Sequence, residues 1–485
     1  MAIRLSSSRM DVGDKTFLKP VFKDYGEVLN DMGPGGGTRD IDLTLGNVVT
    51  ATVSGSTTTF TFSNPSASGT ACSFTLVLTN GGSQTVNWPA AVEWVAGEAP
   101  TLTTSGVDIL TFATTDAGAT WIGFSGGGGI AHDSTLYAWG LGGSGQLGQG
   151  TSAVDRSSPV QVGSLATWAE VSGGMYHALA CRVDGTLWAW GSNANGRLGD
   201  GTTTSRSSPV QIGSLATWKK VSGGGNHSIA LKSDGTLWAW GLNYSGQLAQ
   251  GDLTLRSSPV QIGSLTTWID IATSAYHTMA LKSDSTLWVW GWGGADGRLG
   301  DGTTDARSSP VQIGSLANWK SIATSWDHSL AVKTDGTLWA WGDNAHGRIG
   351  DGTTTNRSSP VQIGSSNTWS AASGGYHHTV ALKSDGTLWA WGRGSYGRVG
   401  DGAYTSRSSP VQIGSLTSWV AISAGMYSSH ALRADGTFWS WGGGYGGALG
   451  NNSITAVGSP VQIGSLTSWK KLSTGRRSTF GIRRV

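Results

Sequence analysis

Charged residues are scarce in this sequence. Asp, Glu, Lys and Arg make up 13% of its 485 residues, about half of the usual share, and the formal net charge is +2. The first 125 residues carry an acidic excess and the remainder a basic one, but no stripe of Lys or Arg stands out. This balance argues against nucleic acid as a partner.

Cysteine and long apolar runs are also nearly absent. Cys72 and Cys181 lie in different halves of the chain, so we expect neither a disulfide nor a metal-type cysteine pair. The first fifteen residues lack the apolar core of a signal peptide, and no apolar run reaches about 18 residues. We therefore expect a chain that is made in a cytoplasm and does not insert into a membrane.

Glycine and tryptophan are abundant instead, with 76 and 25 copies, and they recur in a regular pattern. The stretch LKSDGTLWAWG at residues 231–241 returns at residues 382–392. Three marks each occur seven times, about fifty residues apart: a Ser-Pro pair, a Trp-Gly pair and a further Trp. A period of this length is typical of repeat architectures such as propellers.

Each repeat predicts four short strands. In the second complete repeat they are WKKVSG from Trp218, HSIALK from His227, TLWAWG to Gly241 and SPVQIG around Pro259. We name them A to D. Strand C has apolar residues on both faces, which indicates burial on both faces. Stacked four-stranded sheets closed in a ring meet this requirement, so the sequence predicts a seven-bladed β-propeller in which each tryptophan packs against the next blade.

The ends of the repeat region predict how the ring closes. The first unit enters at strand C, at Ser134, and the last ends after strand B, at Val485. We expect these two half-repeats to form one composite blade. Three copies depart from the pattern: Ser134 and Ser285 replace the glycine of the turn between B and C, and Val457 replaces the arginine that precedes Ser-Pro elsewhere.

The region before the repeats reads as a separate all-β domain. Residues 40–124 alternate like strands, as in SFTLVLT and VDILTFAT, and predict a small β-sandwich. Residues 1–39 show no strong period and predict an extended N-terminal anchoring arm. Residues 125–129 contain Gly126–Gly129 and predict a hinge, which leaves residues 130–485 for the propeller.

The repeats resemble a known family. The run H-x-x-A-L-K-x-D-G-T-L-x-x-W-G at residues 227–241 and 378–392, with GRLGDG at residues 196–201, resembles the regulator of chromosome condensation repeat. This resemblance implies a seven-bladed propeller. It does not imply one function, because such propellers include nucleotide-exchange factors of small GTPases, chromatin-docking proteins and inhibitors of secreted enzymes.

The N-terminal region resembles a second group. Residues 74–124 are similar to a small domain of bacteriophage virion proteins, notably tail fibres and related appendages. The resemblance implies a virion protein whose N-terminal part attaches to other virion proteins. Tail-fibre proteins are often trimers, but no heptad repeat is visible here, so homo-oligomer formation is left open.

Catalytic, metal and cofactor sites are not indicated. Histidine opens strand B in five copies, at His177, His227, His277, His328 and His378. Copies in different blades are too far apart to share an ion, so we expect each to hydrogen-bond within its own blade. We interpret Asp200, Asp301 and Asp351 as turn residues, and the arginine before Ser-Pro as a stacking or carbonyl-binding partner between blades. No nucleophile with a nearby base is visible, so we expect no enzyme.

The repeats differ most in the A–B and C–D loops, which share one face of a propeller. We call it the variable face; the face formed by the B–C and D–A turns is the constant face. Varied aromatics beside Gly, Ser and Asn suit recognition of protein or sugar, although drift in unconstrained loops is the alternative. The candidate partner-binding residues are Tyr176, Tyr244, Tyr276, Trp292, Trp326, His346, Tyr376, Tyr396, Tyr427 and Tyr445.

Three functions remain open at this point. The favoured hypothesis is a phage virion appendage that displays the propeller to a host surface protein or glycan. A capsid or tail decoration without an adhesive role is the variant of this hypothesis. The alternative is a soluble regulator of a GTPase-like protein, which we expect to need a charged working face, and neither loop set shows one in the sequence.

Overall fold

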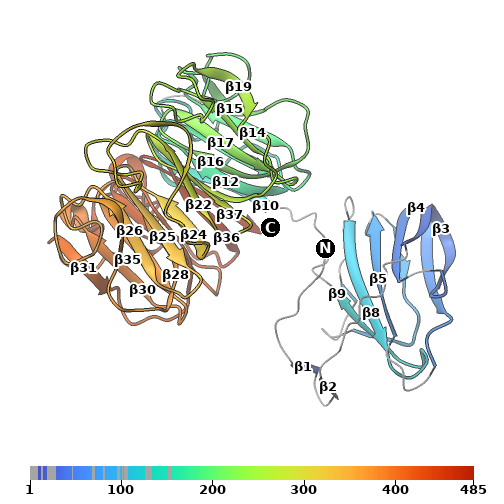
Figure 1. Ribbon diagram of the computed structural model, residues 1–485. Helices are drawn as coiled ribbons and strands as arrows, with labels where there is room; N and C mark the ends of the chain where they lie inside the picture. Colours follow the sequence, from blue (N-terminus) through green and yellow to red (C-terminus); the bar gives the residue numbers. More distant parts are fainter. Residues whose placement is uncertain are drawn as a thin grey trace. The chain divides into compact units, whose positions relative to one another are not determined.

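The computed structural model describes residues 9–12, 15–18, 29–45, 47–67, 72–79, 84–94, 107–125, 134–150 and 154–484, with a few isolated positions between them. The chain divides into two compact units, residues 1–132 and residues 133–485 (Figure 1). The described elements are strands, apart from short 3₁₀ turns such as η2 (Ser395–Gly397) and η3 (Tyr445–Gly447). The predicted hinge at Gly126–Gly129 lies outside the described residues.

The second unit is the predicted seven-bladed propeller, with seven four-stranded antiparallel sheets. Six blades use four consecutive strands each. Blade 1 contains β12 (Trp168–Gly173), β13 (His177–Arg182), β14 (Leu187–Gly191) and β15 (Arg206–Gln211). Blade 2 contains β16 (Trp218–Gly223), β17 (His227–Lys232), β18 (Leu237–Gly241) and β19 (Arg256–Gln261). Blade 3 contains β20 (Trp268–Thr273), β21 (His277–Lys282), β22 (Leu287–Gly291) and β23 (Arg307–Gln312).

The next three blades repeat this layout. Blade 4 contains β24 (Trp319–Thr324), β25 (His328–Lys333), β26 (Leu338–Gly342) and β27 (Arg357–Gln362). Blade 5 contains β28 (Trp369–Gly374), β29 (His378–Lys383), β30 (Leu388–Gly392) and β31 (Arg407–Gln412). Blade 6 contains β32 (Trp419–Ala424), β33 (Ser428–Arg433), β34 (Phe438–Gly442) and β35 (Val457–Gln462). In each blade the four strands correspond to A, B, C and D.

Blade 7 is the predicted composite blade. It combines the first two strands of the unit with the last two, in the order β11-β10-β37-β36. Their bounds are β10 (Ser134–Gly140), β11 (Arg156–Gln161), β36 (Trp469–Thr474) and β37 (Ser478–Arg484). Ser134 lies opposite Arg484 and Gly140 opposite Ser478 in this antiparallel pair, so the two chain ends of the propeller close the ring.

The tryptophans of strand C explain why the same motif recurs in all seven repeats: each interface between blades needs its own apolar cluster. Trp240 is fully buried and packs with Leu187, Ala189 and Leu198 of blade 1, while Leu237 and Ala239 pack with blade 3. Corresponding apolar clusters fill the other blade interfaces. The predicted inter-blade core is confirmed, but the tryptophans face the preceding blade rather than the next one. Burial of one such ring stabilises the fold by roughly 4–6 kcal/mol before entropy is counted.

The first unit is all-β, as expected, but its main sheet is one seven-stranded sheet rather than the two stacked sheets of a sandwich. The bounds are β3 (Leu29–Asp42), β4 (Val48–Ser63), β5 (Cys72–Thr79), β6 (Val86–Asn87), β7 (Val92–Trp94), β8 (Val107–Thr114) and β9 (Trp121–Ser125). The first half of β4 pairs with β5 and its second half with β6, so the sheet turns back over its own core. A small separate hairpin joins β1 (Arg9–Val12) and β2 (Lys15–Leu18).

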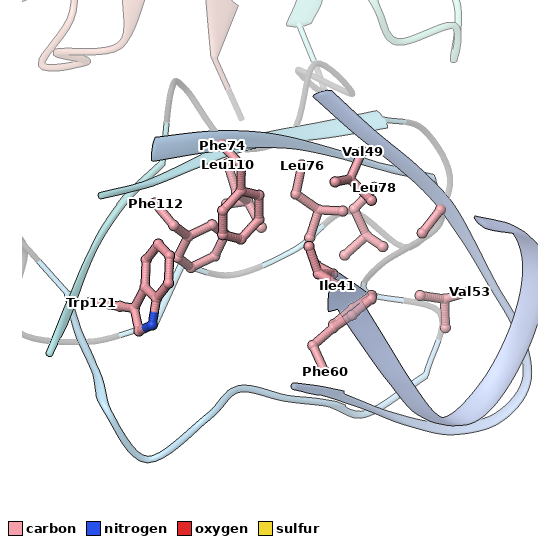
Figure 2. Packing of buried hydrophobic residues seen from close by; sticks show 11 residues of the cluster. Ile41, Val49, Val53, Phe60, Phe74, Leu76, Leu78, Leu110, Phe112 and Trp121 are labelled. Carbon is pink, nitrogen blue, oxygen red and sulfur yellow. The ribbon is translucent and has the colours of Figure 1, made fainter. Parts of the chain in front are cut away.

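The core of this unit comes from the alternation seen in the sequence. Figure 2 shows Phe74, Leu76, Leu110 and Phe112, from β5 and β8, converging on one cluster with Trp121 of β9. The rings of Phe74 and Phe112 are stacked, with centroids 5.0 Å apart. Strand β8 alternates strictly between half-buried and buried positions, as its sequence predicts.

The predicted arm does not extend to residue 39. Residues 29–39 belong to β3, including the glycine-rich stretch Gly33–Gly37. Two register shifts interrupt the pairing with β4 there, and Gly33 and Gly37 adopt positive φ angles of 61° and 76°. The Arg39 guanidinium donates to the carbonyls of Met32, Gly33 and Thr52 around the bends. Such bulges interrupt the alternation of side chains between the two faces of the sheet. The sequence of β3 therefore lacks the alternating pattern by which a strand is predicted.

Candidate functional site

The A–B and C–D loops do meet on one face of the propeller. Tyr276 from the A–B loop of blade 3 contacts Trp292 from the C–D loop of the same blade, with ring centroids 5.1 Å apart. It also contacts Trp326 of blade 4 at 6.1 Å, and Trp326 contacts Tyr376 of blade 5 at 4.4 Å. Four of the ten candidate residues therefore form a continuous aromatic band, which we call the Trp326 band.

A second cluster lies over blades 5 and 6. The ring centroids of Tyr396, Tyr427 and Tyr445 are 5.1–5.6 Å apart in all three pairs. Tyr396 therefore packs with these two tyrosines, whereas Trp326 and Tyr376 belong to the Trp326 band. Tyr396 adopts a positive φ of 65°, which turns the C–D loop of blade 5 at this point.

The remaining three candidates have different surroundings. Tyr176 contacts two guanidiniums, of Arg197 and Arg476. His346 packs against His377 with ring centroids 5.4 Å apart. Burial and the nearby Arg393 and Arg348 lower the pKa of His346. Tyr244 is the most exposed of the ten, at 68%. The variable face thus holds two packed aromatic clusters rather than ten separate side chains.

Arginine is the component of this face that sequence reasoning missed. Four C–D loops place an arginine at the same position, and two A–B loop arginines of blade 7 join them. The six are Arg197, Arg298, Arg348, Arg398, Arg476 and Arg477. Asp296, Asp327 and Asp343 lie between Arg298 and Arg348, in ion pairs of 2.5–3.9 Å. The expectation that neither loop set carries charge is therefore wrong.

A signal for these arginines exists in the sequence. The C–D loops share the pattern G-x-[LIVA]-[GA], and x is Arg in four copies, Gln at Gln146 and Gln247, and Ala at Ala448. Because position x varies while the glycine before it is kept in every copy, the turn does not depend on the side chain at x. That side chain is therefore free to contact a partner.

The histidines that open strand B join neighbouring blades. Nε2 of His177 lies 2.8 Å from Oγ of Ser228 in blade 2, and that hydroxyl donates to the carbonyl of Arg197 at 2.7 Å. The same contact recurs for His227 with Thr278, His277 with Ser329, His328 with Thr379 and His378 with Ser429, at 2.7–3.1 Å. We call it the histidine latch. The expectation that these histidines bond within their own blade is wrong.

The latch requires a proton on Nε2, and burial keeps the histidines neutral. Because the Ser228 hydroxyl donates its single proton to the Arg197 carbonyl, its oxygen must accept from the Nε2–H of His177. Burial holds the pKa of these histidines far below its usual value and lowers the pKa of His227 to about 3. In four of the five latches the hydroxyl donates to the carbonyl of the C–D loop arginine and so fixes the backbone of that loop.

The latch changes at the last two blade interfaces. Ser428 replaces histidine in blade 6, and His430 takes over, with Nε2 2.9 Å from Ser428 Oγ and 3.3 Å from Thr479 Oγ1. Between blades 7 and 1 the corresponding residues are Ser478 and Ala178. There Lys471 pairs with Glu170, and Arg476 donates to the Tyr176 hydroxyl. The closing interface therefore has these polar contacts and no histidine latch, whereas the interface between blades 2 and 3 has both a latch and a Lys220–Asp270 ion pair.

The arginine before Ser-Pro has a role inside its own blade. Arg206, Arg307, Arg357 and Arg407 pair with Asp200, Asp301, Asp351 and Asp401 at 2.6–2.8 Å. The prediction of a contact between blades is wrong. Each aspartate also turns its own loop; Asp200 accepts from the backbone and hydroxyl of Thr202. Where blade 6 has Val457 in place of the arginine, it has Asn451 in place of the aspartate, so both partners of the pair are replaced.

Metal ligation finds no support in this geometry. Across the described ranges of the chain, no three His, Cys, Asp or Glu side chains are placed to hold an ion. The strand-B histidines use Nε2 for the latch. The axial opening of the propeller encloses about 200 Å³. It is lined by small residues of strand A, such as Ser222 and Thr273, and by larger A–B loop residues, among them Trp326, Tyr376 and Arg476. In the part of the chain that the structure describes, no helix has the length and apolar character to cross a membrane.

The fold and its repeats define a repeat-built β-propeller of the kind that presents loops for binding. A family model described as the RCC1-like domain matches residues 257–480, and the regulator of chromosome condensation (RCC1) repeat matches residues 133–181 and 184–231. These matches lie in the propeller unit, whose repeats are similar to the RCC1 repeat.

Two solved structures illustrate the fold. Human WBSCR16 has a TM-score of 0.65 and 22% identity, over 72% of this chain and 99% of that one. Yeast RCC1 has a TM-score of 0.65 and 21% identity, over 73% of this chain and 89% of that one. At this identity the likeness defines the fold alone.

Curated relatives match over much shorter stretches. The X-linked retinitis pigmentosa GTPase regulator homolog of Caenorhabditis elegans is 42% identical over 72 residues, or 14% of this chain and 5% of its own length. The probable E3 ubiquitin-protein ligase HERC6 of Homo sapiens is 36% identical over 74 residues, or 15% of this chain and 7% of its own length. This chain thus matches less than a tenth of each relative.

Proposed function

We propose that the chain is a binding protein without catalytic chemistry, and that its propeller recognises a GTPase-like protein partner through the variable face. The observation that carries this proposal is the composition of that face: tyrosine, tryptophan and arginine packed together, with aspartates between two of the arginines. These residue types are enriched at the centres of protein interfaces and supply most of their binding energy.

The relatives support the class of partner. One of them is, by its name, a GTPase regulator, and yeast RCC1 shares the fold. The charged groups on the variable face remove the objection raised by the sequence, since Arg298, Arg348 and three aspartates lie there. The arrangement requires no reacting group on this chain: a regulator of this type acts by binding one conformation of its partner more tightly than another.

The test is photo-crosslinking in the cells that make the protein. Tyr244 is replaced by p-benzoylphenylalanine, which keeps the aromatic ring at the most exposed candidate position. Leu265, 46% exposed in a D–A turn of the constant face, receives the same replacement as a matched control. We expect a crosslink from position 244 to a GTPase-fold protein, and no crosslink to that protein from position 265.

The captured partner then allows a quantitative check. Trp326→Ala together with Tyr376→Ala removes the centre of the Trp326 band, and we expect affinity to fall at least about 30-fold, which corresponds to about 2 kcal/mol. The purified propeller should also change the rate at which the partner releases labelled GDP. A partner with no nucleotide-binding site, or equal affinity of the double variant, would overturn the proposal.

A second candidate rests on a different observation. Residues 74–124, which resemble a domain of phage virion appendages, lie in a compact unit with its own apolar core. In this candidate, the first unit attaches to a virus particle and the propeller binds a host surface protein or glycan, or merely decorates the particle. Mass spectrometry of particles purified from the source culture distinguishes the two: the regulator is absent from them, and the appendage is present in a fixed copy number.

A further inference from the structure

The variable face is electrostatically uneven. Over blades 3 to 5 the buried arginines are neutralised: Arg298 contacts Asp296 at 3.0 Å and Asp327 at 2.5 Å, and Arg348 contacts Asp343 at 3.1 Å. Over blades 5 to 7 the corresponding position is Arg398, and no ion pair among the described residues includes it. The same loop position therefore has a carboxylate partner in one half of the face and none in the other.

Arg398 is a buried cation with an unused donor. Its side chain is 0% exposed; Nε donates to the Ser395 carbonyl at 2.9 Å and Nη1 to the Met426 carbonyl at 3.2 Å. Nη2 is buried and has no hydrogen-bond partner. Burial and the nearby Arg393 lower the pKa of Arg398 to about 10, so it stays charged at neutral pH. A buried guanidinium without an anion is a costly arrangement that a ligand can relieve.

Further cations surround the same tyrosines. The Arg398 guanidinium lies 5.1 Å from the centroid of the Tyr427 ring, and that of Arg477 lies 5.3 Å from it. Arg477 is also 5.6 Å from the Tyr445 ring. Arg393 and Arg477 are half-buried, and Tyr396 and Tyr445 are exposed by 39% and 38%. The site therefore presents accessible cations and tyrosine hydroxyls above a buried positive charge.

We propose that this site binds a carboxylate-rich segment of a protein partner. It consists of Arg393, Tyr396, Arg398, Tyr427, Tyr445 and Arg477, and we call it the Tyr427 site. Two guanidiniums lie within reach of the Tyr427 ring, and among the described residues neither Arg398 nor Arg477 forms an ion pair with a carboxylate. This leaves a positive potential that two or more Asp or Glu side chains complement. The proposal rests on the proposed function, because it names the chemistry by which the variable face selects its partner.

A protein segment fits the site better than an acidic sugar does. Sugar rings stack flat on exposed aromatic faces, and here the three tyrosine rings pack against one another at interplanar angles of 58–80°. Arg398 and Arg477 occupy further positions near the Tyr427 ring. The exposed groups that remain are hydroxyls and guanidiniums, which bind carboxylates by directed hydrogen bonds.

The experiment is a fluorescence-anisotropy titration of the full-length chain with fluorescein-labelled octaglutamate, beside labelled octaglutamine. We expect octaglutamate to bind and octaglutamine not to bind, with affinity falling as salt rises. Arg477→Gln and Arg393→Gln should each weaken binding about tenfold or more, because each removes a charge-assisted contact. Arg433→Gln is the matched control: Arg433 is a half-buried arginine beside a turn of the constant face, and its loss should leave binding unchanged.

Each outcome decides the proposal. Equal octaglutamate binding by wild type, Arg477→Gln and Arg393→Gln would overturn it, as would no binding at low salt. An oligogalacturonate that binds more tightly than octaglutamate and depends on Arg477 would overturn the assignment to protein in favour of acidic sugar. Octaglutamate can fail to bind while position 244 still crosslinks to a GTPase-fold partner and the double variant Trp326→Ala, Tyr376→Ala still binds that partner more weakly. In that case the proposed function stands and only this inference fails.

Discussion

Nε2 of His328 in blade 4 lies 2.8 Å from Oγ1 of Thr379 in blade 5, and this single contact connects the core of the propeller to its variable face. The Thr379 hydroxyl donates to the carbonyl of Arg348, which also accepts from the Trp391 indole at 2.8 Å. The Arg348 side chain leaves this anchored backbone to meet Asp343. Blade packing and the geometry of the binding loops are thus held by the same few atoms.

Loss of one latch should destabilise the propeller. His328→Ala leaves Thr379 with an unsatisfied buried acceptor and opens a cavity, so we expect the free energy of unfolding to fall by about 2–4 kcal/mol. Urea unfolding followed by tryptophan fluorescence measures this. His346→Ala, at a half-buried loop position, should change it by less than about 1 kcal/mol. Similar losses for the two variants would contradict the latch.

The latch also predicts acid sensitivity. The pKa of His227 and of His430 is lowered to about 3 by burial, whereas an unfolded histidine has its ordinary pKa of about 6.5. Below pH 6.5 these histidines therefore bind protons in the unfolded state but stay unprotonated in the folded state. Stability is complete above pH 6.5 and falls as the pH drops toward 3, by about 2 kcal/mol for each of these histidines between pH 6.5 and 5. Urea midpoints that stay constant between pH 7 and 5 would refute this.

A turn offers a stabilising substitution. Ser285 occupies the glycine position of the B–C turn in blade 3 with a φ of 64°, where a side chain is strained. Ser285→Gly should stabilise the propeller by about 0.5–1 kcal/mol. The reverse change in blade 4, Gly336→Ser, should destabilise it by more, because a Cβ there would lie 2.0 Å from the Asn367 carbonyl oxygen. Thermal unfolding of both variants provides the comparison.

Ring closure can be tested by a stop codon after Lys471. The truncation removes β37 and the second half of β36, including the buried Phe480 and Ile482 of the cluster between blades 7 and 1. The edge of β10 that paired with β37 is then uncovered, and both neighbouring blade interfaces lose part of their packing. We expect loss of cooperative unfolding and of solubility. A truncated chain that melts like the intact protein would mean that blade 7 is dispensable for closure.

Most of the propeller could be predicted because its information is periodic. The spacing of Trp218, His227 and Gly241 and of their copies gave the strands, the blade order and the composite blade. The contacts between blades could not be predicted in the same way. Periodicity shows that His177 and Ser228 recur one repeat apart, but not that the two side chains meet across the interface.

The candidate site was predicted in part for the same reason. Aromatic loop residues stand out where the copies differ, and the structure brings seven of the ten candidates into two clusters. The arginines were missed because Arg398 belongs to a glycine-rich turn that looks structural, and its charge becomes unusual only when the neighbouring loops supply no carboxylate. In the first unit, the bends of β3 at Gly33 and Gly37 break the alternation on which strand prediction depends.

The pairing of Ser134 with Arg484 gives the propeller a direction of mechanical weakness. Both ends of the propeller chain lie at the same end of the antiparallel β10–β37 pair, so tension between them loads the hydrogen bonds one after another, as in opening a zip. Bonds loaded in sequence yield at lower force than bonds sheared together. A pull on the two ends would therefore open blade 7 first, while the six blades built from consecutive strands remain intact.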